Sequence, residues 1–200
     1  MQAKSINRLF AYLIDLFIYG LLVLIVISIF KLDDNKLLVN LSNELENINQ
    51  AFIDGNMNFS NYITEYSRIS YLIDKNEVLV NIVNVILLMT LYVFIPFFTK
   101  GQTIGKKIVK IKIVKINNKE LDINTLIVRS LFINFIGHML ISLGLVFVLK
   151  DTGYYILSLI LTIFELLLVI ISIFMILYKS EKRGVHDYIT GTQVIDVEGW

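Results

Sequence analysis

The sequence predicts an all-α membrane protein with four transmembrane helices and both termini in the cytoplasm. The first supporting observation is composition. Of 200 residues, 56% are hydrophobic and 18% are charged, whereas soluble domains carry about 25% charged residues. The second is that apolar residues are concentrated in segments of about 20 residues, the length that crosses a hydrocarbon core about 30 Å thick. The predicted spans are 9–30, 78–98, 126–149 and 154–178.

The four spans form a single membrane domain over residues 1–200, and the charges between them predict its orientation. The loop 99–125 holds seven Lys against two acidic residues, and the tail 179–200 begins with basic residues. The loop 31–77 holds eight acidic residues against four basic ones. Because cytoplasmic segments are enriched in Lys and Arg, the loop 99–125 and both termini are expected in the cytoplasm of a multi-pass plasma membrane protein.

The first span contains one charged residue, Asp15, and begins beside a basic residue, Arg8. Seven residues are close to two helical turns, so the two side chains lie on one stripe about 10 Å apart. A carboxylate at the centre of a spanning helix costs roughly 2.5–3.5 kcal/mol on insertion scales. Asp15 is therefore predicted to be either a hydrogen-bonded structural group within the bundle or a proton or cation site.

The outer loop is predicted to be helical. Apolar residues recur at helical spacing over 38–52 and again over 59–73, which indicates two amphipathic helices. Together they are expected to form a small cap on the outer membrane surface. The chain has no Cys, so disulfides and Cys-based metal sites are impossible.

The cytoplasmic loop begins with the segment Gly101-Gln102-Thr103-Ile104-Gly105-Lys106-Lys107. It is not a phosphate-binding loop, because its glycines are one residue too close and Lys107 replaces the magnesium-binding Ser or Thr. The next run, 107–116, is β-branched with mostly alternating Lys and predicts a strand, followed by a turn at 117–120. Since a lone strand is not stable in water, we expect it to pair with 192–197.

The third and fourth spans carry polar residues on one face each. His138 and Glu165 lie near mid-bilayer on helices joined by a tight turn. Such stripes are typical of helix-packing seams; a His–Glu pair could also relay protons, because imidazole titrates near neutral pH. Arg129 enters from the same side as Asp15, and we expect these two to form an ion pair, with Arg8 as the competing partner.

The tail contains an adjacent His–Asp step in a turn-rich segment, His186-Asp187. Two adjacent residues without a third ligand are weak evidence for a metal site. No metal and no cofactor are therefore expected.

Four of these features together resemble the RDD family of bacterial membrane proteins. The family is named for one arginine and two aspartates, which the resemblance places at Arg8, Asp15 and Asp187. The resemblance implies a bacterial inner-membrane location and, because some members look like sodium, lithium or potassium/proton antiporters, suggests transport. The features are Arg8-x-x-Ala11-x-x-x-Asp15, Gly101-Gln102-Thr103-x-Gly105-Lys106-Lys107, Arg129, and His186-Asp187-x-x-x-Gly191-Thr192-x-Val194.

The chain also departs from the family pattern. Lys110 and Lys112 stand where the family often has Gly and Arg, and the loop 31–77 looks like an insertion. His138 and Glu165 are not part of the family pattern, so their proposed relay comes from this sequence alone.

The first functional hypothesis is a small-solute transporter, best described as a monovalent cation/proton exchanger whose titrating group is Asp15. Such a protein would not be an enzyme, and its partners would be the lipid bilayer, cations and protons, with no nucleic acid. Four helices form only a narrow transport path, which implies a homo-oligomer. The alternative is a non-transporting scaffold or assembly subunit. The candidate residues are Arg8, Asp15, Arg129 and Asp187 for transport or ion pairing, His138 and Glu165 for the relay, and Gly101, Gln102, Thr103, Gly105 and Lys106 for the cytoplasmic motif.

Overall fold

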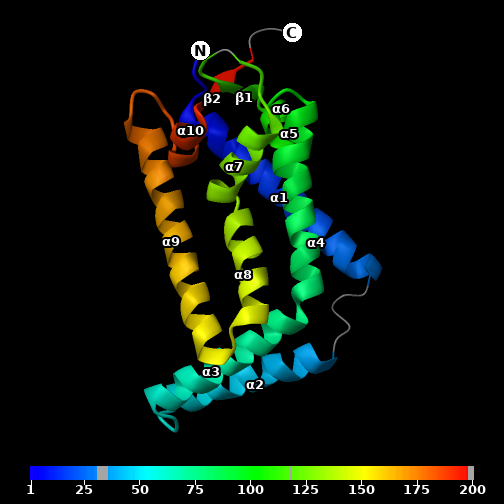
Figure 1. Cartoon of the computed structure of the whole chain (residues 1–200), viewed down its shortest axis with the longest axis vertical. Helices are drawn as coiled ribbons and strands as arrows, with labels where there is room; N and C mark the ends of the chain where they lie inside the picture. The colour runs from blue at the N-terminus through cyan, green and yellow to red at the C-terminus, as the bar shows by residue number, and fades with distance from the viewer. Residues whose placement is uncertain (31–35, 118, 198–200) are drawn as a thin grey trace.

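The structure is a computed structural model that describes residues 1–30, 36–117 and 119–197. It is an elongated bundle of helices with a small sheet at one end and two crosswise helices at the other (Figure 1). We call the end with the sheet the terminal end and the end covered by α2 and α3 the cap end. The elements are α1 Ser5–Phe30, α2 Lys36–Ile53, α3 Phe59–Asn76, α4 Val78–Met89, η1 Thr90–Phe94, α5 Ile95–Phe98, α6 Ile104–Ile108, β1 Ile111–Lys115, α7 Ile123–Ile133, α8 Ile136–Val148, α9 Asp151–Tyr178, α10 Val185–Thr190 and β2 Thr192–Asp196.

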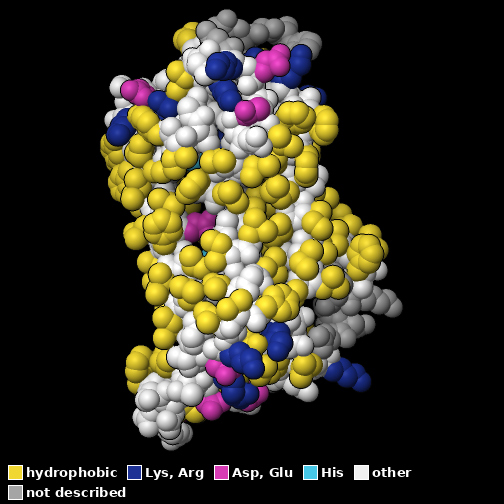
Figure 2. Space-filling view, in the orientation of Figure 1, with side chains coloured by type: hydrophobic (Ala, Val, Ile, Leu, Met, Phe, Trp, Pro, Cys, Tyr) yellow, Lys and Arg dark blue, Asp and Glu magenta, His cyan; other side chains and the backbone are white. Residues whose placement is uncertain are grey.

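Three helical segments in the described ranges are long and apolar enough to cross a membrane. They are Ser5–Phe30, Val78–Phe98 and Asp151–Tyr178, which confirms the first, second and fourth predicted spans. Apolar side chains cover the middle of the molecule and charged ones gather at its two ends (Figure 2). This is the distribution expected when the middle of a bundle faces lipid, which cannot hydrogen-bond polar groups.

The third predicted span, 126–149, is not a single straight helix. Its residues form α7 and α8, whose axes bend by 76° at the break between them. Phe135 lies in this break with a φ of 58°, a left-handed conformation that costs a non-glycine residue roughly 1–2 kcal/mol. Hydropathy measures length and apolarity alone, so it could not detect this bend.

Strands β1 and β2 form the predicted pair. The structure shows that the pairing is antiparallel, with Ile113 opposite Val194. Their buried side chains pack with Ala3, Ala11 and Leu126 in one apolar cluster. Gln2 also bridges to β2, so the N-terminal segment and the C-terminal strand lie at the same end of the bundle.

The predicted strand 107–116 began too early. Lys107 and Ile108 complete the short helix α6, and β1 starts at Ile111, because Thr103 caps a helical turn ahead of the strand. The predicted turn at 117–120 includes Asn118, and the loop 31–77 begins at Lys31; both residues lie outside the described ranges.

The two helices predicted within 31–77 are confirmed as α2 and α3. Two hydrogen bonds join α3 to α9. The hydroxyls of Ser67 and Thr152 lie 3.0 Å apart, and the Tyr154 hydroxyl donates to Asp74 at 2.9 Å. The cap is therefore joined to the ends of the spanning helices by hydrogen bonds as well as by apolar packing.

Candidate functional site

A buried network around Asp187 lies at the terminal end. Arg129 of α7 donates from Nη1 to Oδ1 of Asp187 and to the Thr192 hydroxyl, the latter at 2.6 Å. Arg8 of α1 lies 3.4 Å from the other oxygen, Oδ2. The Gly184 backbone N–H donates to the same oxygen at 3.1 Å. The carboxylate thus joins α1, α7, α10 and β2.

The two arginines of the network stabilise the charged form of Asp187. Burial alone would disfavour its charged form, but the charges of Arg129 and Arg8 and the contact with His186 hold the pKa of Asp187 well below its usual range. Hydrogen bonds between charged groups are about twice as strong as neutral ones. Removing one member would leave a buried charge without its partner, which costs roughly 3–5 kcal/mol.

The predicted pair between Asp15 and Arg129 is wrong. Asp15 accepts a hydrogen bond from the Thr103 hydroxyl at 2.5 Å and one from the Gly105 backbone N–H at 2.7 Å. Its buried carboxylate therefore caps the start of α6. Arg129 binds Asp187 instead because the tail folds back against α7, which a depth estimate on the spans alone could not include.

The glycines of the loop segment 101–107 have a structural explanation. Gly101 adopts a φ of 96°, and a Cβ there would overlap the Ile113 carbonyl oxygen. Gln102 donates to the Ile111 carbonyl at 3.0 Å. At Gly105 a Cβ would overlap the Ala11 carbonyl oxygen. The segment therefore fits its backbone between β1 and α1.

His186 and Lys106, both at the terminal end, also have shifted pKa values. Burial, reinforced by the charge of Arg129, lowers the pKa of His186 to about 4, while Asp187 opposes the shift. Loss of hydration lowers the pKa of Lys106 to about 8, and the charge of Asp15 opposes it. The His186 imidazole is therefore neutral at physiological pH and does not add a third positive charge beside Asp187.

The predicted pairing of His138 with Glu165 is not formed. The His138 Nε2 lies 3.1 Å from the Thr162 hydroxyl, one turn away from Glu165 on α9. Both Glu165 oxygens are buried and have no hydrogen-bond partner among the described residues. The side chain as a whole is 5% exposed.

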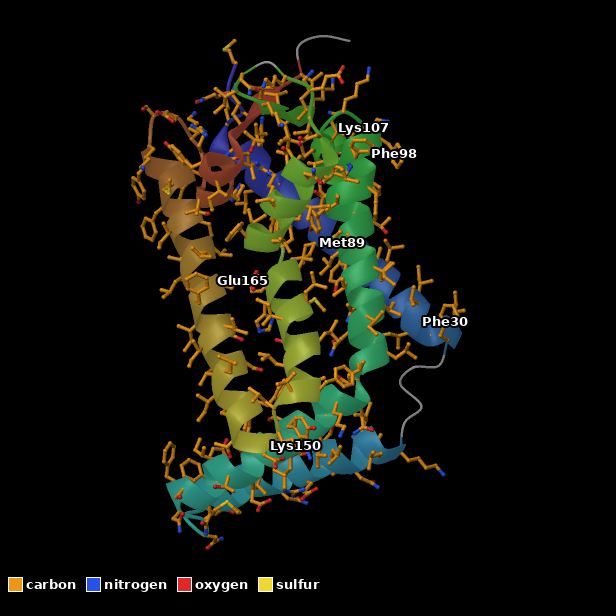
Figure 3. The ribbon with its side chains drawn as sticks, in the orientation of Figure 1. Phe30, Met89, Phe98, Lys107, Lys150 and Glu165 are labelled. Atoms are coloured by element: carbon orange, nitrogen blue, oxygen red, sulfur yellow. The ribbon has the colours of Figure 1, made fainter. Side chains whose placement is uncertain are left out.

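Glu165 lies beside the break in the third span. Its side chain extends from α9 toward the junction of α7 and α8 (Figure 3). The backbone of Phe135, which precedes the first residue of α8, lies near this carboxylate. In Figure 2 an acidic side chain is visible inside the apolar band, at the place labelled Glu165 in Figure 3. The positive end of the α8 dipole thus faces a buried carboxylate.

A cavity of about 400 Å³ lies between α3, α8 and α9 at the cap end. Its lining extends from Asp74 and Tyr154 near the cap to His138 and Thr162 deep in the bundle. Thr162 is three residues before Glu165 on α9, so the two lie on one helical face. The cavity therefore reaches to within about one helical turn of the unpartnered carboxylate.

Sequence reasoning missed several residues that the structure brings into these sites. Thr192 belongs to the tail motif but was not recognised as a partner of both Arg129 and Asp187. Asp74 and Tyr154 had no signal, because each is an ordinary polar residue near a helix end.

Among the described residues, no group of three or more His, Cys, Asp or Glu could hold a metal ion.

The spanning helices, the apolar surface and the charged ends define an integral membrane protein. A family model described as the RDD family matches residues 2–191, nearly the whole length, and the chain belongs to that family. Arg8, Asp15 and Asp187 are the residues expected from the family resemblance, and the structure places two of them in the same network. No curated protein matches the chain, and no solved structure matches it.

Proposed function

We propose that the protein exchanges protons for a small monovalent cation across the cytoplasmic membrane, with the cap end outside and the terminal end inside. The excess of Lys in 99–125 over acidic residues supports this orientation, since basic segments are retained in the cytoplasm. The cavity at the cap end then serves as an outward vestibule for the solute.

The observation that carries the proposal is the unpartnered carboxylate of Glu165 in the middle of α9. An ionisable group inside a membrane is costly and is by default a candidate functional site, proton relays and ion pathways among the possible kinds. A buried carboxylate without a partner is neutral once it has bound a proton. After it releases the proton, a bound cation stabilises its negative charge. Binding the two ions in turn is the elementary step of exchange.

Asp15 is less suited to this role than the sequence indicated. Its two oxygens already accept hydrogen bonds from Thr103 and Gly105, and protonating it would weaken the cap of α6. Asp187 is likewise held by two arginines. We therefore assign the titrating role to Glu165 and structural roles to the two aspartates.

The test is proton flux in proteoliposomes that contain an internal pH dye, with Na⁺, K⁺, Li⁺ and an organic ammonium salt added in turn. Glu165→Gln should insert and fold like the wild type but lose at least about tenfold in flux, because it cannot exchange a proton. Asp15→Asn should mainly lower the yield and thermal stability of the protein.

The two variants separate the competing assignments. Unchanged flux in folded Glu165→Gln would overturn the role of Glu165. Full loss of flux in Asp15→Asn with wild-type stability would return the titrating role to Asp15. Absence of flux with every cation, in correctly inserted wild-type protein, would overturn exchange altogether.

The second candidate is a non-transporting scaffold or assembly subunit, and the Asp187 network favours it. This one carboxylate joins helices α1, α7 and α10, and Thr192 adds strand β2. These ion pairs and hydrogen bonds stabilise the terminal end, which would then present a rigid docking surface to a partner protein. On this hypothesis Asp187→Asn should destabilise the protein while no ion flux exists to be lost.

A further inference from the structure

The cavity at the cap end has a single carboxylate in its wall. Asp74 accepts a hydrogen bond from the Tyr154 hydroxyl at 2.9 Å, and among the described residues no Lys or Arg forms an ion pair with it. His138 on the facing helix interacts with it electrostatically. A carboxylate that borders a cavity without a Lys or Arg partner favours a cationic occupant.

The wall beside this carboxylate is aromatic. Tyr66 of α3 and Tyr155 of α9 meet edge to face with ring centroids 5.4 Å apart, and both line the cavity together with Tyr154. The faces of aromatic rings attract cations, most strongly where water is excluded. Aromatic rings around a carboxylate are the arrangement that recognises alkylated ammonium groups.

The size of the cavity and the type of its lining do not fit a bare metal cation. A dehydrated metal ion needs a close shell of oxygen ligands, whereas this space of about 400 Å³ offers one carboxylate and scattered hydroxyls. Pockets for small organic molecules start at roughly 300 Å³ and are mostly apolar with a few polar groups. The buried Ser142 hydroxyl in the wall, which has no partner among the described residues, provides one further polar group.

The surroundings of the cavity would also attract cations. Glu77 is close enough to Asp74 for their charges to interact, and the loop 31–77 carries eight acidic residues against four basic ones. A field of one sign around a cleft raises the local concentration of oppositely charged solutes.

We propose that this cavity is a binding site for a small organic ammonium ion, with Asp74 as its counter-charge and Tyr66, Tyr154 and Tyr155 around its alkyl groups. This inference names the solute that is exchanged, so it rests on the proposed function. Binding can nevertheless be measured separately from flux, so the two can fail independently.

The experiment is calorimetric titration of the full-length protein in lipid nanodiscs with choline and with 3,3-dimethyl-1-butanol, its uncharged isostere. Choline should bind at least about tenfold more tightly, because only the cation interacts with the carboxylate and the rings. Asp74→Asn should weaken choline binding about tenfold or more. Tyr155→Leu, which keeps the charge, should weaken it about threefold to tenfold.

Asp54→Asn is the matched control. Asp54 lies at the cap end, is exposed and accepts a hydrogen bond from Gln50, and it does not line the cavity. This variant should therefore bind choline within about twofold of the wild type. Equal binding of choline and its isostere, no binding of either, or equal losses in Asp74→Asn and Asp54→Asn would overturn the inference. Choline binding without any proton flux would overturn only the proposed exchange. Proton flux with Na⁺ alone, without choline binding, would overturn only the inference that the cavity binds an organic ammonium ion.

Discussion

Four buried or partly buried carboxylates differ in the number of their hydrogen-bond and ion-pair partners, and our proposed division into structural and functional roles rests on that difference. They are Asp187, Asp15, Asp74 and Glu165. Asp187 is held by two arginines and a backbone N–H, and Asp15 by a hydroxyl and a backbone N–H. Asp74 accepts one tyrosine hydroxyl, and Glu165 has no partner among the described residues. Saturated groups stabilise the fold, whereas unsaturated ones remain able to bind a proton or a ligand.

His186 should make the protein acid-sensitive. Its pKa in the folded state is about 4, against about 6.5 when unfolded. Between these values the unfolded state binds more protons, so stability falls as the pH falls. Lowering the pH from 7.5 to 5.0 should cost about 2 kcal/mol through this residue. Thermal unfolding of the purified protein across that range measures the loss.

The second histidine supplies the control for this prediction. The chain has two His, and His138 hydrogen-bonds Thr162 far from the Asp187 network. His138→Gln should keep the acid sensitivity, and His186→Gln should flatten it even if its stability at pH 7.5 is lower. Equal pH profiles in both variants would contradict the assignment.

At the scale of elements, the contact between α6 and α1 depends on a missing side chain. A Cβ at Gly105 would overlap the Ala11 carbonyl and lie 3.0 Å from the Asp15 carboxyl carbon. Gly105→Ala should therefore separate α6 from α1, remove the cap that Asp15 provides and lower stability by about 2–4 kcal/mol. Thermal unfolding and hydrogen exchange over 101–116 report this change.

Gly144→Ala is the matched control, because a Cβ there meets no atom within 4 Å. This variant lies within α8, where Ala is the better helix former. It should leave stability unchanged or raise it slightly. A Gly105→Ala protein as stable as Gly144→Ala would show that the helices can separate without cost.

The predictability of each element follows from the range of the interactions that form it. Spans depend on local apolar length, so α1, α4 with α5, and α9 follow from the sequence. The bend at Phe135 depends on one backbone angle, which apolar composition does not encode. The partner of Arg129 depends on the tail, 58 residues away, and depth counting on the spans selected Asp15 instead.

At the scale of the whole molecule, the N-terminal segment, the sheet and the Asp187 network lie together at one end, and the acidic cap lies at the other (Figure 1). The terminal end is therefore held together by buried ion pairs and hydrogen bonds, whereas the cap end contains the cavity. On the proposed exchange mechanism, and with the terminal end held by its buried contacts, we expect the conformational change to occur around the α7–α8 break, where Phe135 has a left-handed conformation.

The orientation of these two ends can be measured directly because the chain has no Cys. The variant Asn56→Cys, at an exposed position between α2 and α3, should react with a membrane-impermeant maleimide on intact cells. The variant Lys107→Cys, at an exposed position in α6, should react only after the membrane is permeabilised. The unmodified chain is the blank, since it has no thiol to label. The opposite pattern would place the Lys-rich loop outside, against the charge bias that retains such loops in the cytoplasm, and the cavity proposed as a binding site would then lie at the cytoplasmic end.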